Sequence, residues 1–127
     1  MDSEVLVIKK RSDFVRVSQR GFRVKASSLL VLCLQKQREC EILSSNVGYT
    51  ASRKVGSAVL RNRAKRRLRH LVLEFRRIIS GCGCEFVFIA NSKTPHIDFS
   101  ILKSEFLSCI LRCKERLDSG LNSKSCF

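Results

Sequence analysis

A dense run of cations between positions 53 and 77 is the part of the sequence best suited to chemistry. Ten of these 25 residues are Lys or Arg, and Glu74 alone is acidic. The guanidinium group of Arg presents a planar set of donors that fits phosphate oxygens and stacks on bases. Cations at fixed helical spacing suit a phosphate backbone better than a small substrate. The motif within the run reads Arg61-Asn62-Arg63-Ala64-Lys65-Arg66-Arg67-Leu68-Arg69.

The overall charge also favours a polyanionic partner. The chain has 127 residues, a net charge of +14 and a pI of about 10.1. A charge run is often only a solvated helix face, but here balancing carboxylates are almost absent, so repulsion would destabilise a helix unless a polyanion neutralised it. Charge alone does not separate duplex DNA from structured RNA, although no helix-turn-helix pattern or dimer spacing is evident. An anionic membrane fits less well, because no apolar run is long enough to span a bilayer.

The residues that acid–base or nucleophilic catalysis needs are sparse. There is no Gly-rich phosphate loop, no paired carboxylate motif and no evident Cys/His pairing. His70 falls within the basic run, where an extra surface donor is its expected role, and His96 follows the only proline in a loop. We therefore expect no catalytic residue on the protein itself.

Seven cysteines, in a chain whose first residues do not resemble a signal peptide, are expected to be reduced thiols in a cytoplasmic protein. They would pack in the core as small hydrophobes. Two close pairs leave a zinc site open as an alternative, although Cys-x-Cys is not the usual zinc spacing. That site would use Cys82, Cys84, Cys109 and Cys113.

The first half of the chain predicts one helix and two strands around a polar turn. Ser12 is the expected cap of a short helix over residues 13–18, which Gly21 ends. The apolar run 29–34 has the length of a strand. Residues 42–51 alternate between two faces and are expected to be its antiparallel partner.

The second half predicts a helix, a central strand and a last helix. Ser57 is the expected cap of an amphipathic helix that reaches about Ile79. Its apolar stripe is Leu60, Ala64, Leu68, Leu71, Phe75 and Ile78. Residues 84–90 are apolar on both faces apart from one Glu, which is typical of a central strand. The last helix covers about residues 98–117, with a buried side of Ile101, Leu102, Phe106, Cys109, Ile110 and Cys113.

Several stretches resemble the protein component of bacterial ribonuclease P, over roughly residues 6 to 115. The most specific is Val55-Gly56-Ser57-Ala58-Val59-Leu60 followed by the basic motif, which is close to the family's Arg-Asn-Arg pattern. Supporting matches are Lys9 to Phe14, Gly21, Val47 to Lys54, and Phe86 to Asn91. The resemblance implies one domain over residues 1–127, with a core of about 6–117 and a flexible tail over 118–127.

The resemblance also implies a fold and a function. The expected fold is α+β, a mainly antiparallel sheet packed by helices, with a left-handed βαβ crossover that is an exception to the usual hand. The catalytic subunit of this family is an RNA that removes the 5′ leader of precursor tRNA. Magnesium is expected to be held mainly by RNA, and not by protein side chains alone. The expected partners are therefore ribonuclease P RNA and precursor tRNA, without DNA or membrane, and the protein alone is expected to be monomeric.

Two groups of site residues follow from matching the motifs. The residues expected to bind the catalytic RNA are Arg53, Lys54, Arg61, Asn62, Arg63, Lys65, Arg66 and Arg69. The residues expected to bind the leader, in a cleft between the first helix and the sheet, are Lys10, Arg11 and Phe14. A core anchor of the first helix is the alternative role of Phe14.

Two residues depart from the family pattern, and one rival function would use the same helix. Ser18 and Leu32 stand where many members have aromatic residues, so stacking on the leader is expected to be weaker here. The rival is a general RNA-binding or ribosome-associated protein, which would use the same basic helix as an electrostatic anchor and change no reaction rate.

Overall fold

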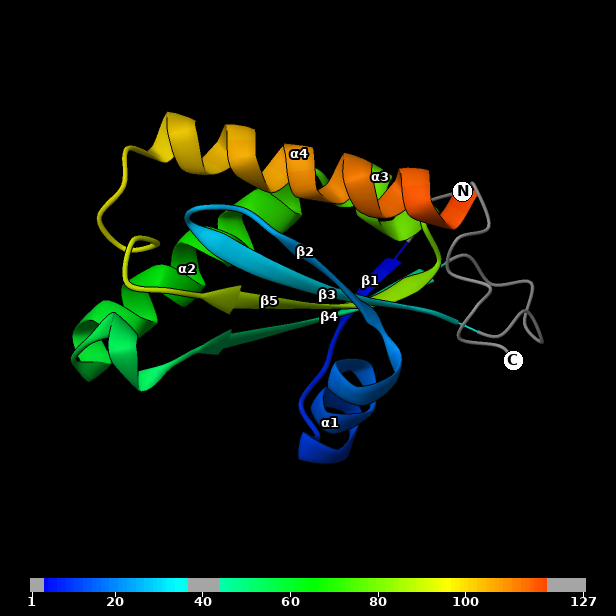
Figure 1. Cartoon of the computed structure of the whole chain (residues 1–127), viewed down its shortest axis with the longest axis horizontal. Helices are drawn as coiled ribbons and strands as arrows, with labels where there is room; N and C mark the ends of the chain where they lie inside the picture. The colour runs from blue at the N-terminus through cyan, green and yellow to red at the C-terminus, as the bar shows by residue number, and fades with distance from the viewer. Residues whose placement is uncertain (1–3, 37–43, 119–127) are drawn as a thin grey trace.

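The computed structural model describes residues 4–36 and 44–118, which form a five-stranded sheet with helices on both faces (Figure 1). The strands lie in the order β1-β4-β5-β3-β2. Their bounds are Glu4–Val7 for β1, Phe22–Lys25 for β2, Leu29–Gln35 for β3, Ser44–Ala51 for β4 and Cys84–Ala90 for β5. The helices are α1 (Arg11–Arg20), the 3-10 helix η1 (Arg53–Val55), α2 (Ala58–Glu74), α3 (Arg76–Gly81) and α4 (Phe99–Asp118).

The two faces of the sheet hold apolar clusters of different size. The larger cluster lies between the sheet and α2, α3 and α4, and it includes the fully buried Phe86, Phe88 and Phe106. The ring centroids of Phe88 and Phe106 are 4.9 Å apart, which is a favourable aromatic separation. The smaller cluster lies under α1 and consists of Ile8, Val17, Leu32 and Val87. One helix thus covers this second face, which is also where the structure has a cleft.

β5 is the centre of the sheet, as its apolar sequence predicts. It pairs antiparallel with β3 and parallel with β4. The expected antiparallel pairing of β4 with β3 is wrong, because β5 lies between them and the chain reaches it from β4 by a crossover through α2 and α3. β4 also pairs parallel with β1, and β2 pairs antiparallel with β3. The α+β class and the βαβ unit are therefore confirmed, but the sheet is mixed rather than mainly antiparallel.

Of the two serine caps predicted for helix starts, the one at Ser12 is wrong and the one at Ser57 is confirmed. α1 begins at Arg11, so Ser12 lies inside the helix, and Lys10 occupies the N-cap position without a side-chain hydrogen bond. The end of α1 at Gly21 is confirmed. Ser57 caps α2 as predicted, because its hydroxyl accepts a hydrogen bond of 3.3 Å from the N–H of Leu60.

The long predicted helix is broken at Phe75, where φ is −104° and ψ is 25°. The ring of Phe75 stacks on Phe106 at 6.1 Å between centroids, so the apolar stripe continues across the break into α3. In α4, the expected burial of Ile101 is wrong, since its side chain is 48% exposed. A helix turns by about 100° per residue, which places Ile101 beside the stripe that passes through Leu102.

The predicted tail over 118–127 starts one residue too early, because Asp118 is the last residue of α4. Residues 119–127 of the tail lie outside the described residues, as do residues 37–43, which hold part of the predicted turn and the start of the predicted strand over 42–51. Within the described ranges, no helix combines the length and the apolar character needed to cross a membrane.

Candidate nucleic-acid interface

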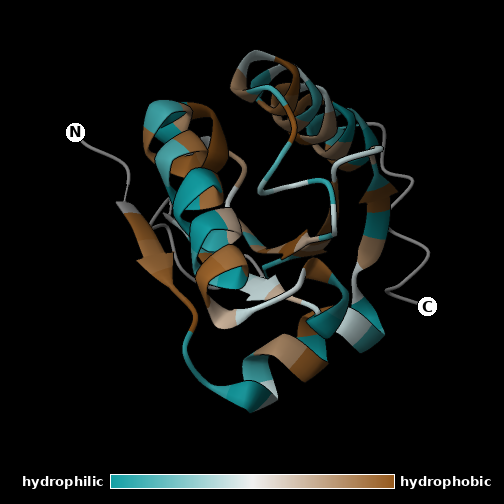
Figure 2. Cartoon of the chain, turned by 90° about the vertical axis from the view of Figure 1, so that its left-hand side faces the viewer, coloured by the Kyte–Doolittle hydropathy of each residue, from teal (hydrophilic) through white to brown (hydrophobic). Residues whose placement is uncertain are grey.

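Helix α2 presents four of the nine residues of the basic motif to solvent as exposed side chains. Its buried residues, which seat it on the sheet, are Ala64, Leu68, Leu71 and Val72. This stripe turns the opposite side of the helix outwards, and hydrophilic residues dominate that outward side (Figure 2). Of the residues expected to bind the catalytic RNA, those exposed there are Asn62, Arg63, Arg66 and Arg69. Arg61 and Lys65 are half-buried on the flank of the helix.

The basic pair before the helix is held by a glycine turn. Arg53 and Lys54 are exposed in η1, whereas Val55 is buried and anchors this turn in the core. Gly56 has φ of 130°, in a region that L side chains rarely adopt, and a Cβ there would lie 2.8 Å from Cδ1 of Leu60. The turn therefore fixes where the basic pair lies relative to the start of α2.

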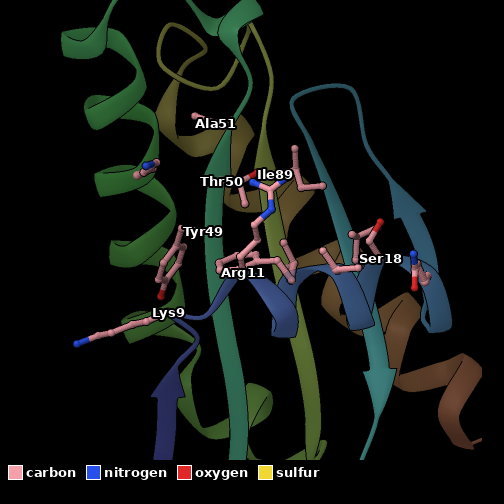
Figure 3. Close-up of a pocket in the computed structure, with 13 residues that line it drawn as sticks. Lys9, Arg11, Ser18, Tyr49, Thr50, Ala51 and Ile89 are labelled. Carbon is pink, nitrogen blue, oxygen red and sulfur yellow. The ribbon is translucent and has the colours of Figure 1, made fainter.

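A cleft of about 630 Å³ opens on the face of the sheet that carries α1 (Figure 3). Its apolar floor comes from the strands and includes Leu32, Val87 and Ile89. Three cations contribute to its rim: Lys9, Arg11 and Lys65. In Figure 3 the side chain of Arg11 extends from the start of α1 across the strands. An open groove with an apolar floor and a cationic rim can receive a single strand of nucleic acid.

Phe14 forms a wall of the cleft and also anchors α1. Its ring packs directly on β4 at Gly48, where a Cβ would approach the ring to 2.6 Å. On its inner side Phe14 packs against the small cluster under α1. Phe14 therefore packs against the core and also lines the cleft.

An ion pair holds α1 over the centre of the sheet. Glu85 is the buried acid of β5, and Arg16 of α1 donates to its carboxylate and, at 2.8 Å, to that of Asp13. The hydrogen bond to Glu85 is the largest cause of the raised pKa of Arg16. The acid that interrupts an otherwise apolar strand thus has a positioning role beneath the cleft-forming helix.

The motif helix and the cleft share an edge. Lys65 of α2 lines the cleft together with Tyr49 of β4. The guanidinium carbon of Arg69 lies 5.5 Å from the ring centroid of Tyr49, at cation–π distance. Burial raises the pKa of Tyr49 to about 12, although the charge of Arg69 opposes that shift. Residues expected to bind the catalytic RNA therefore reach the wall of the cleft.

Arg67 has a different role from its neighbours in the motif. Its Nη1 donates to the carbonyl oxygens of Thr94 at 2.8 Å and Ile97 at 2.7 Å, and the guanidinium carbon lies 5.6 Å from the ring centroid of Phe99. Burial is the largest cause of the lowered pKa of Arg67. This cation therefore ties α2 to the loop before α4 instead of facing a ligand.

The structure places two of the three expected leader-binding residues in the cleft. Arg11 and Phe14 line it, whereas Lys10 lies at the N-cap position of α1 and is not among the lining residues. Ser18 and Leu32, the two departures from the family pattern, both line the cleft. The lining residues that sequence reasoning did not assign to the leader are Lys9, Val15, Gln19, Tyr49, Thr50, Ala51, Lys65, Val87 and Ile89. The sequence showed that residues of β4 alternate between two faces, but it did not show which of these faces lies under α1.

The cysteines of the described residues are core thiols. Cys33, Cys84, Cys109 and Cys113 are buried, and these and the half-buried Cys82 are all free. Hydrogen bonds with Cys113 and Cys84, and then burial, raise the pKa of Cys33. Between residues 4–36 and 44–118, no group of three or more His, Cys, Asp or Glu side chains is arranged to hold a metal ion. The zinc alternative therefore has no support in the arrangement of its four thiols.

Comparisons with known proteins agree on one family. The family model described as Ribonuclease P matches residues 3–114. The ribonuclease P protein component of Paramagnetospirillum magneticum is 33% identical, over 83% of this chain and 80% of that protein. That of Helicobacter pylori strain Shi470 is also 33% identical, over 90% of this chain and 80% of that protein.

Solved structures show the same fold. The ribonuclease P protein of Staphylococcus aureus matches with a TM-score of 0.73 and 25% identity, over 85% of this chain and 94% of that one. That of Thermotoga maritima matches with a TM-score of 0.69 and 24% identity, over 83% and 94%. Given the family match over residues 3–114 and the two relatives above, the chain belongs to the ribonuclease P protein family.

Proposed function

We propose that this chain is the protein subunit that binds ribonuclease P RNA through α2 and η1 and the 5′ leader of precursor tRNA in the cleft. The observation that carries the proposal is the edge shared by these two surfaces. Lys65 lines the cleft from α2, and Arg69 of the same helix lies over Tyr49 in the cleft wall. A leader in the cleft would run beside the helix that holds the catalytic RNA.

The cleft suits a single strand because its chemistry changes from rim to floor. Lys9, Arg11 and Lys65 can neutralise phosphates, and the apolar floor can receive bases. Phe14 and Tyr49 are its aromatic lining residues, while Ser18 and Leu32 offer no ring for stacking. The expected consequence is affinity that depends on phosphates more than on base identity.

The protein's contribution to cleavage is electrostatic and positional. In this family the RNA carries the catalytic centre, and we propose that it also holds the magnesium ions, with no protein side chain as their sole ligand. Arg53, Lys54 and the exposed cations of α2 would lower the magnesium requirement by neutralising crowded phosphates near that centre. We further propose that the protein alone is monomeric and acts in the cytoplasm.

The experiment is cleavage of a precursor tRNA by ribonuclease P RNA at low magnesium, with and without the full chain. The expected result is that the protein alone cleaves nothing and restores cleavage at the mature 5′ end when the RNA is present. The rival, a general RNA-binding protein, predicts binding without a change in rate. A substrate with a one-nucleotide leader is the matched control, because it cannot occupy the cleft and should gain less from the protein.

A further inference from the structure

Two large apolar side chains of α2 face solvent. Val59 is 76% exposed and Leu73 is 66% exposed. Neither belongs to the apolar clusters of the described residues. Because each keeps most of its surface in water, neither contributes much to folding through burial. Their place on the helix that carries the basic motif makes both side chains available to a partner that binds this helix.

Val59 and Leu73 lie at the two ends of one row on the outward side of α2. The row consists of Val59, Asn62, Arg66, Arg69 and Leu73, with steps of three and four residues that keep neighbours on one helix face. From Val59 to Leu73 it extends about 21 Å, at 1.5 Å per residue. This outer row therefore has polar and cationic side chains in its middle and an apolar side chain at each end.

The charge around Leu73 favours RNA over a protein partner. Arg66 and Arg69 precede it on the row, and the exposed Arg76 and Arg77 follow it in α3. The adjacent acid, Glu74, is already paired with Lys103 of α4. An RNA helix offers both kinds of surface at once, because its wide minor groove displays riboses and base edges between phosphate strands.

We propose that Leu73 and Val59 pack against ribose or base surfaces of the catalytic RNA at the two ends of the outer row. Arg66 and Arg69 would bind the phosphates between these apolar contacts. The inference rests on the proposed binding of the catalytic RNA by α2, and it adds a component of affinity that does not depend on salt. Burying apolar surface releases no counterions, whereas each phosphate contact does.

The test is to titrate ribonuclease P RNA with the full chain and its variants over a series of KCl concentrations. Leu73→Ala and Val59→Ala should each weaken binding about fivefold at every salt concentration and leave the slope of log Kd against log salt unchanged. Arg66→Gln should instead reduce that slope by about one unit. The matched control is Leu111→Ala, because Leu111 is 48% exposed on α4, away from the proposed interface. This variant should bind RNA with the affinity of the unchanged protein.

Each outcome separates this inference from the proposed function. The inference would be supported if Leu73→Ala and Val59→Ala raised Kd by the same factor at every salt concentration and kept the melting temperature of the unchanged protein. The Kd of Leu111→Ala should stay unchanged. The inference would be overturned if the Leu73 and Val59 variants kept their affinity while Arg66→Gln reduced the salt slope. In that case the α2 interface would stand, and Leu73 would be expected to contact a protein partner. Unchanged binding in all three variants would overturn both the inference and the proposed α2 interface.

Discussion

Replacing Arg67 with Ala should destabilise the fold and leave the salt slope of RNA binding nearly unchanged, although Arg67 lies inside the basic motif. The change removes the hydrogen bonds to Thr94 and Ile97, at 2.8 and 2.7 Å, and the contact with Phe99. Hydrogen bonds to a charged donor contribute about 1.5–3 kcal/mol each, and an exposed cation–π contact about 0.5–1 kcal/mol. Because one nitrogen makes both bonds at a half-exposed site, we expect a loss of about 2 kcal/mol in the free energy of unfolding.

The assay combines thermal unfolding with RNA titration. A loss of about 2 kcal/mol lowers the melting temperature of a chain this long by about 8 °C. Arg66→Ala is the matched control, since it removes the same charge from the next position, where the side chain is exposed. It should keep the melting temperature and reduce the salt slope of RNA binding by about one unit. Arg67→Lys should be intermediate in stability, because an ammonium group lacks the planar fork.

The two adjacent arginines should therefore differ: Arg67→Ala should lower stability and keep the salt slope, whereas Arg66→Ala should keep stability and lower the salt slope. The structural role of Arg67 would be refuted if Arg67→Ala had the melting temperature of the unchanged protein and a salt slope lower by about one unit. An equal loss of stability in Arg66→Ala would show instead that charge on α2, whatever its contacts, governs folding.

Three further predictions concern the cleft. Phe14→Ala should reduce the preference for precursor over mature tRNA, and should also cost about 3 kcal/mol of stability, which urea unfolding would measure. Gly48→Ala should displace the Phe14 ring, because its Cβ would lie 2.6 Å from it, so the leader preference should fall although no cleft charge changes; an unchanged preference would show that the ring's position is unimportant. The single tyrosine, Tyr49, should titrate near pH 12 when folded and near about 10 when unfolded, as read from phenolate absorbance. Since its folded pKa is the higher one, Tyr49 stabilises the fold fully below about pH 10, and this contribution is lost as the pH rises towards 12.

The secondary structure was most predictable where a local pattern determines it. The stripe of α2 and the hydroxyl of Ser57 act within one helix, so periodicity and capping were enough to place them. Pairing in the sheet depends on strands that are distant in sequence. β1 and β2 have four residues each, too few to show a period, and they are ordered by pairing with β4 and β3.

The sequence predicted which cations form the candidate site better than it predicted the shape of the cleft. The motif identified the cations of α2, because their number and spacing are explicit in the sequence. The cleft depends on α1 lying over the sheet, which the pairing of Arg16 with Glu85 and the contact of Phe14 with Gly48 bring about. These contacts join residues far apart in sequence. Lys9, Tyr49 and the floor residues Val87 and Ile89 could therefore be assigned to the cleft only from the fold.

Three consecutive cations of the motif serve three different surfaces. Lys65 reaches the cleft, Arg66 lies on the outer row, and Arg67 binds the loop before α4. The rotation of about 100° per residue along a helix is what separates them. A count of basic residues therefore overstates the phosphate contacts that α2 can make, because at least Arg67 is committed to the fold. The salt dependence of RNA binding should accordingly fall below what the number of cations between positions 53 and 77 suggests, because a cation with an internal partner makes no phosphate contact.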